Sequence, residues 1–138
     1  MNRLIVAVLV ASGLCGAASA DTKDVFGTFA TVDGSSHIVI TDCGDGSPCG
    51  RVVWFDPVKL ESGVRVEDAR DAKGNKILGL LLLTGFSEKS SDWRGGTIYD
   101  PEDGKVYASR LKRRGDGKLE VKGCIGPVCQ TQIWKPVS

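Results

Sequence analysis

After position 20 the chain alternates between short runs of strand-forming residues and clusters of turn residues. The runs contain mainly Val, Ile, Thr and aromatic residues, and the clusters contain mainly Gly, Asp, Ser and Pro. Short apolar runs that recur with turn residues between them predict an all-β sandwich or barrel. Seven such runs lie at residues 25–32, 37–42, 51–55, 93–99, 105–113, 118–124 and 128–134.

An eighth run, ILGLLLLTGF at residues 77–86, is the most apolar part of the chain after position 20. As a helix it is too short to cross a bilayer, so we interpret it as a buried strand. Alternate side chains of a strand face opposite sides. Both faces are therefore apolar, one with Leu78, Leu80, Leu82 and Phe86, the other with Ile77, Leu81 and Leu83. We expect one face to line the core and the other to lie under residues 56–76 or against a partner chain.

The eight predicted strands are joined mostly by short links, which favours a single antiparallel domain. Eight strands in sequence order close naturally into an up-and-down β-barrel, and closure removes the exposed sheet edges. The alternative is a two-sheet sandwich, because the number of strands alone does not fix closure. Residues 56–76 are polar and charged without a helical face, and we interpret them as a long excursion between two strands.

The first 20 residues have the pattern of a secretory signal peptide. Arg3 precedes an apolar core at residues 4–14, and Ala18-Ser19-Ala20 precedes Asp21. This order predicts cleavage after Ala20, which leaves a barrel domain at residues 21–138 without a transmembrane segment. The alternative is a retained membrane anchor, but the apolar core is short for a span. We therefore predict a periplasmic or secreted protein.

The cysteines support export and the barrel. Cleavage removes Cys15, one of five cysteines, and the remaining even number in an exported chain indicates two disulfides. In an up-and-down barrel the second and seventh connections lie at opposite ends, one strand length of ~17–20 Å apart, whereas a disulfide tolerates about 6 Å between Cα atoms. We therefore expect two local bonds, Cys43–Cys49 and Cys124–Cys129.

The charge balance excludes one class of partner. The full chain has 18 Lys and Arg, and loss of Arg3 leaves 17 against 17 Asp and Glu. A formally neutral domain lacks the basic excess of a broad nucleic-acid surface, so we predict no nucleic-acid partner. The cluster at residues 110–114 (RLKRR) is interpreted as a strand end that faces water, with a phosphate- or carboxylate-binding patch as the alternative.

No motif for catalysis or for a cofactor is found. His37 is the only histidine, so no second His and no free Cys can share a metal ion with it. A Gly-x-Ser-x-Gly elbow is absent, and the acidic turn at residues 100–104 lacks the ligand spacing of an EF-hand loop. We predict a non-enzymatic protein without metal or cofactor.

Several short motifs follow one another in a characteristic order over nearly the whole mature chain. They include Gly27-Thr28-Phe29, Gly50-Arg51-Val52-Val53-Trp54, Trp93-Arg94-Gly95-Gly96, Tyr99-Asp100-Pro101 and Gln132-Ile133-Trp134. In this combination the chain resembles the exported bacterial family catalogued as domain of unknown function 2147. That family is similar to the lipocalins, and the resemblance implies a lipocalin-like barrel that binds a ligand, although a fold is a weak guide to function.

The lipocalin resemblance also implies a closing contact at one end of the barrel. Lipocalins carry an early Gly-x-Trp and a late basic residue that together close one end. By resemblance Phe29 and Lys135 take these places, with Phe where the pattern has Trp and Lys where it has Arg. We therefore expect the contact between the cation and the aromatic ring to be weaker here than the Trp–Arg contact of the lipocalin pattern.

The large aromatic residues are the candidates for a ligand-binding site. Core packing or plugging of a barrel end is their alternative role, since each lies in a predicted strand. An apolar pocket with Thr and Gln at its rim would suit a small amphipathic ligand. The candidate residues are Phe29, Trp54, Trp93, Tyr99, Tyr107 and Trp134.

Two functional hypotheses follow from these patterns. The first is an exported, non-enzymatic barrel that binds a small hydrophobic or amphipathic ligand. The alternative is an envelope interaction or structural module with a filled barrel, which pairs with a second copy or an envelope partner through an apolar outer face near Leu81 and Leu83. A connected cavity of ~300–1,000 Å³ distinguishes the first from the second.

Peptide mapping of the oxidised protein tests the predicted topology. We expect one disulfide-linked fragment to join Cys43 to Cys49 and another to join Cys124 to Cys129. A bond between an early and a late cysteine would contradict both the barrel and the ligand-carrier hypothesis that depends on it.

Overall fold

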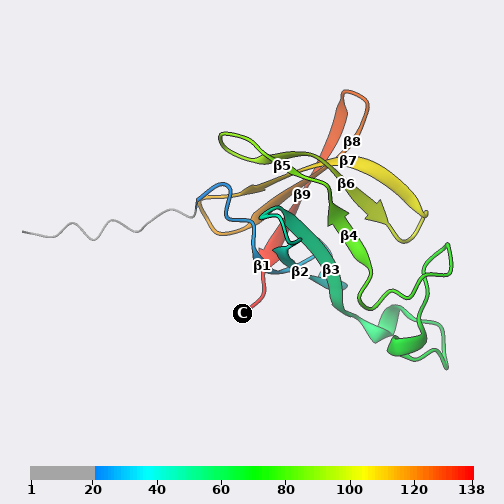
Figure 1. Cartoon of the computed structure of the whole chain (residues 1–138). Helices are drawn as coiled ribbons and strands as arrows, with labels where there is room; N and C mark the ends of the chain where they lie inside the picture. Colours follow the sequence, from blue (N-terminus) through cyan, green and yellow to red (C-terminus); the bar gives the residue numbers. More distant parts are fainter. Residues whose placement is uncertain (1–20) are drawn as a thin grey trace, which may run out of the picture.

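Each of the eight predicted runs contributes a strand to the computed structural model, which describes residues 21–138 (Figure 1). The predicted signal peptide, residues 1–20, lies outside the described residues. Two short 3-10 helices, η1 (Pro57–Lys59) and η2 (Val66–Asp68), lie between the third and fourth strands. The strands are β1 (Gly27–Ala30), β2 (Ser36–Asp42), β3 (Pro48–Phe55), β4 (Leu81–Thr84), β5 (Ser87–Glu88), β6 (Trp93–Asp100), β7 (Lys105–Arg113), β8 (Leu119–Ile125) and β9 (Val128–Pro136).

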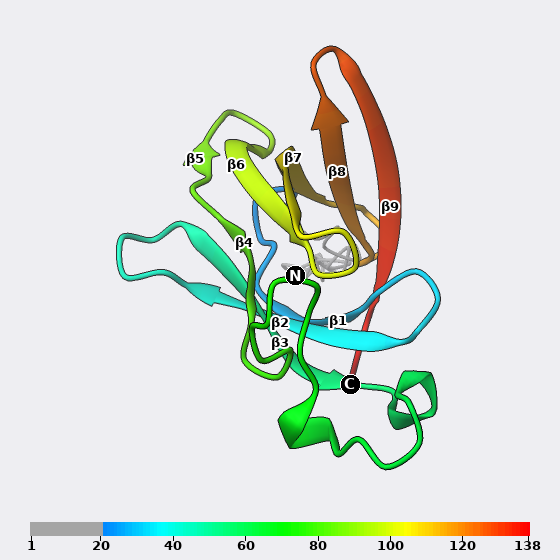
Figure 2. The ribbon, with the colours of Figure 1, turned by 90° about the vertical axis from the view of Figure 1, so that its right-hand side faces the viewer.

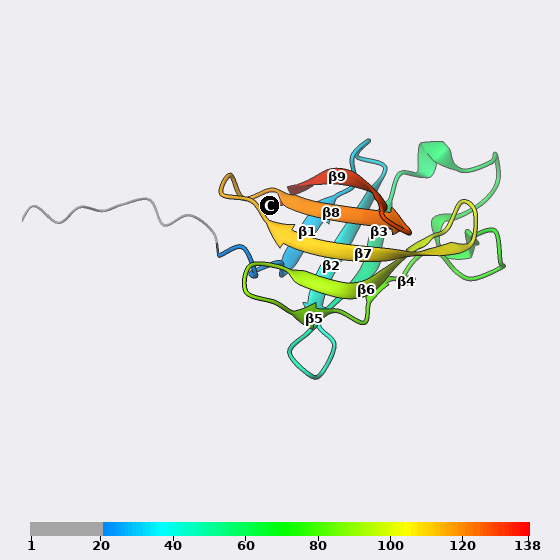
Figure 3. The ribbon, with the colours of Figure 1, turned by 90° about the horizontal axis from the view of Figure 1, so that it is seen from above.

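The sheet closes on itself, as predicted. Every strand pair is antiparallel in the order β4-β3-β2-β1-β9-β8-β7-β6-β5, and β4 also pairs with β6, so eight strands form a barrel and β5 extends it from β6. In Figures 2 and 3, β1, β2 and β3 run across β7, β8 and β9. The β1–β9 and β4–β6 ladders join the two groups, which excludes a sandwich of separate sheets.

The interior of the barrel is occupied by side chains. Directly opposite residues in neighbouring strands share a face, so the register identifies the inward set. Burial of these side chains is the main favourable term in folding. The inward residues that are almost completely buried are Phe29, Ile38, Ile40, Val52, Leu83, Leu111, Leu119, Val121 and Trp134.

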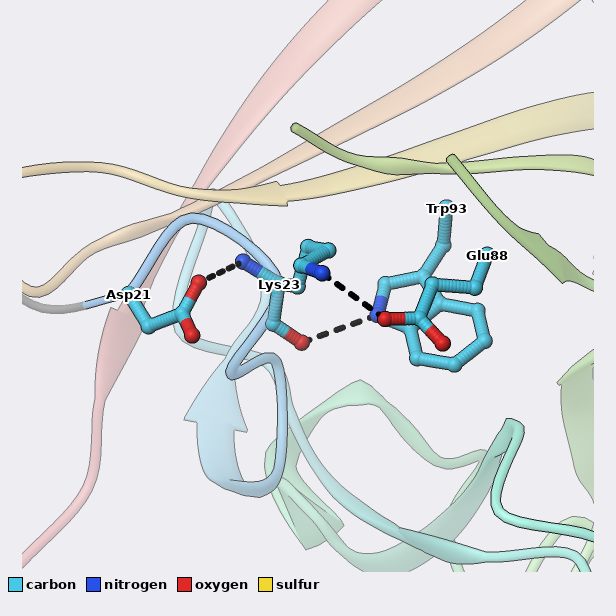
Figure 4. Close-up of polar contacts among 4 residues, drawn as sticks. All are labelled: Asp21, Lys23, Glu88 and Trp93. Carbon is cyan, nitrogen blue, oxygen red and sulfur yellow. Dashed lines mark hydrogen bonds and ion pairs between the residues drawn. The ribbon is translucent and has the colours of Figure 1, made fainter. Parts of the chain in front are cut away.

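The two ends of the barrel are covered differently, and we name them by the segments that lie there. Residues 21–26 cross the strap end, where the backbone N–H of Arg113 donates to the C=O of Thr22 at 2.8 Å. The Trp93 Nε1–H donates to the C=O of Lys23 at 2.8 Å, and the Lys23 ammonium pairs with Glu88 at 2.8 Å (Figure 4). The hydrogen bond to Glu88 raises the pKa of Lys23. Residues 56–80 lie at the other, excursion end.

The closing contact at the strap end differs from the expectation for Phe29 and Lys135. The guanidinium group of Arg113 lies 5.0 Å from the centroid of the Phe29 ring, and its Nη1 donates to the C=O of Asp24 at 3.3 Å. Lys135 is exposed and pairs with Ala30 through the backbone. Arg113 shares the inward face with Leu111 because the two residues are two positions apart in β7. The cation on Phe29 therefore comes from the 110–114 cluster, not from the last strand.

The run at residues 77–86 is only partly a strand. Residues 77–80 form a turn, in which the N–H of Leu80 donates to the C=O of Ile77 at 3.0 Å and Gly79 has a φ of 85°. The expectation that both apolar faces are covered holds for β4. Leu83 faces the core with 0% exposure, so the expectation that it lies on an outer, partner-facing surface is wrong, whereas Leu81 is half-buried and lies on the outer wall.

A β-bulge reverses the predicted faces at the end of β3. The register between β2 and β3 shifts between His37 and Ile38, so Trp54 pairs with His37 while Val52 pairs with Ile38. Val52 is buried, but Trp54 is 39% exposed, and its ring stacks on His37 with the centroids 4.5 Å apart. Simple alternation would place Trp54 on the same face as Val52. The bulge turns Trp54 to the outer face instead.

The long excursion is fastened to the outside of the barrel at the β6–β7 hairpin. The Tyr99 hydroxyl on β6 donates to Asp71, and the Ala72 N–H donates to the C=O of Pro101 at 3.1 Å. Desolvation raises the pKa of Asp71, but hydrogen bonds from Tyr99 and Asn75 outweigh it and lower the pKa from 3.8 to about 2. Asp71 therefore stays ionised and holds the segment in place at neutral pH.

Both disulfides join the cysteines that were expected to pair. The Cα atoms are 5.1 Å apart in Cys43–Cys49 and 4.0 Å apart in Cys124–Cys129. The first bond closes the β2–β3 connection at the strap end, and the second closes the β8–β9 hairpin at the excursion end. Among residues 21–138, the helices are too short and too polar to span a bilayer.

The inward face of β6 makes a test of core packing possible, because Gly96 and Gly123 both lie opposite Ser109. A Cβ at Gly96 would lie 2.4 Å from the Phe86 ring, whereas a Cβ at Gly123 meets its nearest atom at 3.7 Å. We expect Gly96→Ala to lower the free energy of unfolding by about 1–3 kcal/mol through overpacking. Gly123→Ala is the matched control, and urea denaturation measures both. Equal effects of the two substitutions would contradict this packing.

The docking of residues 56–80 should depend on pH through Asp71. Its pKa is lowered on folding, so its contribution to stability is complete above the unfolded value of 3.8 and is lost as the pH falls through the folded value of about 2. We expect Asp71→Asn to reduce the loss of unfolding free energy between about pH 5 and about pH 2. Urea denaturation at the two pH values measures this difference. An identical loss in wild type and variant would exclude the role of Asp71.

Candidate functional site

Two adjoining cavities, both shallow and open to solvent, lie on the outer wall of the barrel, between residues 56–80 and the strands β4, β6, β7 and β8. Their volumes are about 580 Å³ and about 330 Å³, and Val106 lines both. We call them together the outer groove. The larger cavity is lined by Lys73, Gly104, Lys105, Val106, Tyr107, Ala108, Cys124 and Ile125. The smaller cavity is lined by Asn75, Leu80, Leu81, Leu82, Thr84, Thr97, Tyr99 and Val106.

The floor of the outer groove is formed by residues that alternate out of the barrel. Tyr99 lies opposite Val106, and Thr97 lies opposite Ala108, so these four share the outer face of β6 and β7. Val106 is 59% exposed although its side chain is apolar. Ile125, which lines the larger cavity with Val106, is 71% exposed, so the groove presents more than one apolar side chain to water.

The rim of the larger cavity carries two lysines from different elements. A Cβ at Gly104 would lie 3.1 Å from the Cγ and Cε atoms of Lys73, so the stem of Lys73 packs against that glycine. Gly104 has a φ of 68°, which a glycine adopts readily and a larger residue does not. Within residues 21–138, neither Lys73 nor Lys105 forms an ion pair with a carboxylate. Both ammonium groups are therefore available to an anion.

A tyrosine and an aspartate fix the turn beside Lys105. The Tyr107 hydroxyl donates to Asp103 at 2.6 Å, and the Lys105 backbone N–H donates to the same carboxylate at 2.8 Å. These hydrogen bonds lower the pKa of Asp103, with that from Tyr107 the larger, and the same bond raises the pKa of Tyr107. Asp103 remains ionised at neutral pH, and Tyr107 remains a hydrogen-bond donor.

The structure separates the predicted aromatic candidates into three places. Tyr99 and Tyr107 line the outer groove. Phe29 and Trp134 are buried in the barrel, where the Trp134 Nε1–H donates to Gln132 at 2.9 Å. Trp93 is buried beneath the strap, and Trp54 lies on the outer face of β3.

The described residues contain no arrangement that points to metal chemistry. His37 contacts Trp54, and no group of three or more His, Cys, Asp or Glu side chains in residues 21–138 could hold a metal ion. The buried polar residues Ser47, Asp92 and Ser109 lie on different strands and loops.

The pattern of the sequence pointed to only part of the outer groove. Lys73, Lys105 and Val106 were not predicted as site residues. The alternation in β7 holds a signal for Val106, because Ser109 and Leu111 face inward and the alternation then leaves Val106 outward and apolar. Lys73 carries no such signal, since its position depends on how residues 56–80 fold back on the barrel.

The comparisons with known proteins agree with the barrel and with the motifs. A family model described as "Uncharacterized protein conserved in bacteria (DUF2147)" matches residues 27–136. The search of curated proteins found no match. Among solved structures, the protein HP1028 from the human pathogen Helicobacter pylori, described as belonging to the lipocalin family, is 20% identical, with a TM-score of 0.65 and 85% of each chain covered.

At this identity the likeness to HP1028 shows the fold alone, and the fold is a lipocalin-like barrel. The family model spans most of the described residues, and the resemblance inferred from the motifs is confirmed. This chain belongs to the bacterial family DUF2147.

Proposed function

We propose that this protein is an exported, non-enzymatic binding protein for a small amphipathic anion, and that the ligand lies in the outer groove. The observation that carries the proposal is the pair of adjoining cavities with an apolar floor and two lysines at the rim. Cavities of about 300–1,000 Å³ with mainly apolar walls and a few polar groups are typical of small-molecule sites.

The distribution of side chains suggests how such a ligand would lie. An alkyl chain would cover Val106 and Ile125, which removes apolar surface from water. A carboxylate or phosphate head would lie between Lys73 and Lys105, where charge-assisted hydrogen bonds are roughly twice as strong as neutral ones. Tyr99 and Thr97 supply hydroxyl groups along the floor.

The packing of the barrel favours the outer wall over the interior. The inward side chains Ile38, Leu83 and Leu111 are fully buried, and Phe86 occupies the space beside Gly96. A ligand inside would have to displace these contacts, whereas the outer groove exists without rearrangement. The groove therefore offers binding at a lower cost in packing energy.

Two features support an extracytoplasmic location. The structure forms two disulfides, which persist mainly in oxidising compartments. The pattern of residues 1–20 predicts export to the periplasm or beyond. An envelope compartment is rich in lipids and fatty acids, which have the anionic, amphipathic chemistry that the outer groove fits.

Titration of the protein with dodecanoate tests the proposed ligand class. We expect binding that weakens roughly tenfold or more when Lys73→Met and Lys105→Met are combined, because both charged hydrogen-bond donors are lost while the apolar stems stay. Dodecanol, with the same chain and no charge, should bind more weakly than dodecanoate. Isothermal titration calorimetry measures all three.

The controls separate the outer groove from other binding places. Val106→Asp should weaken binding because it places a carboxylate between the two cavities, whereas Lys89→Met, near the strap end, should leave the affinity unchanged. Absence of dodecanoate binding, or unchanged affinity in Val106→Asp, would refute the proposed site. Quenching of the buried Trp93 and Trp134 fluorescence in a variant with a blocked groove would place the ligand in the barrel instead.

A further inference from the structure

One edge of β9 is left unpaired along most of its length. β9 pairs with β8 from Val128 to Trp134, but it pairs with β1 only at Lys135 and Pro136. Figures 1 and 2 show that the β8–β9 hairpin extends beyond the rest of the barrel. Barrel closure therefore covers only the last part of this edge.

The register identifies the backbone groups that the free edge offers. The Cα atoms of Cys124 and Cys129 are 4.0 Å apart, the close spacing of an antiparallel pair that exchanges no hydrogen bonds. Because such pairs alternate, Cys129 and Thr131 direct their N–H and C=O groups away from β8. The bond from the Val137 N–H to the C=O of Thr28, at 2.8 Å, confirms that odd-numbered residues face the β1 side.

The free edge lacks the features that usually prevent association. Natural edge strands are protected by charged residues, proline or bulges. Residues 128–133 read VCQTQI, without charge or proline, and Val128 is 70% exposed. The nearest such residues, Pro127 and Lys135, stand outside this segment. An edge of this kind accepts another extended strand.

We infer that two copies of this chain pair through their β9 edges, antiparallel about a twofold axis at Gln130. In this register Cys129 of each copy exchanges backbone hydrogen bonds with Thr131 of the other, about four bonds in all. Pairing centred on Thr131 would instead bring Pro127 of the second copy to Lys135, where Ala30 of β1 already lies. Centring on Gln130 sets Pro127 opposite Ile133 and leaves β1 clear.

The chemistry of the segment favours a second copy over a foreign strand. An uncharged edge paired with itself places no like charges opposite each other, and like charges in opposed positions destabilise a sheet. The two Gln130 side chains face each other across the axis, and each can donate and accept a hydrogen bond through its amide. The mature chain is formally neutral, so no net charge opposes association.

Introduction of a charge at Gln130, on the twofold axis, provides the test. Gln130 lies opposite Gly123 in its own chain, so a new charge there meets no side chain of β8. We expect the wild-type protein to sediment as a dimer that dissociates on dilution. Gln130→Lys and Gln130→Glu should each weaken it at least tenfold, because like charges then meet at the axis. An equimolar mixture of the two variants should restore the dimer. Analytical ultracentrifugation measures the dissociation constants.

Two further variants control for folding and for charge. Thr41→Lys adds the same charge on an exposed part of β2 and should leave the dimer intact. Thr131→Pro removes an N–H group that points away from β8, so the hairpin should persist in circular dichroism while the dimer is lost. A monomeric wild-type protein, or full dimerisation of both Gln130 variants alone, would overturn the inference. Failure of the mixture to dimerise would exclude the twofold pairing.

Discussion

An eight-stranded sheet that closes on itself encloses a space only about as wide as the side chains that fill it. In this chain Phe29, Leu83 and Trp134 occupy that space with almost no exposure, and Gly96 leaves room for the ring of Phe86. The strap end is then shut by residues 21–26 and by Arg113 over Phe29. Because side chains fill the interior, the surfaces left for binding a ligand or a partner are the outer wall and the sheet edges.

The outer wall acquires a binding surface because residues 56–80 fold back on it. Asp71 is the central contact: its carboxylate accepts hydrogen bonds from Tyr99 on the barrel and from its own loop. These bonds bring Lys73 beside Lys105, although the two residues belong to separate elements. The same alternation that fills the barrel leaves Val106 outside, so the apolar floor and the cationic rim meet in one groove.

The short seam between β1 and β9 has a second consequence. β1 has four residues and covers only the last positions of β9, so the β8–β9 hairpin projects with one edge unpaired. The disulfide Cys124–Cys129 holds this hairpin together beyond the barrel. A rigid, uncharged strand edge is thereby presented on the side of the molecule away from the strap. The larger cavity of the outer groove reaches the same hairpin through Cys124 and Ile125, which pair with Cys129 and Val128, so the groove and the edge adjoin.

The sequence by itself determined the number and order of the main strands, and it favoured the closed barrel and, with it, the local pairing in both disulfides. Those features depend on local patterns: apolar alternation, turn residues, and the parity of connections in an up-and-down sheet. Single residues were harder to place. The bulge at Val53 turned Trp54 outward, the turn at Gly79 shortened β4, and Arg113, not Lys135, lies over Phe29.

Only the tertiary structure decided the candidate site. Of the predicted aromatic residues, Tyr99 and Tyr107 line the outer groove, although the register places Tyr99 opposite Val106 and Tyr107 opposite Ile98, on the other face. Lys73 and Asp71 belong to a segment without periodicity, and their positions come from contacts with residues about 30 positions away along the chain. Local sequence fixes which backbone forms a strand; which side chains then meet depends on register and long-range docking, which no short pattern encodes.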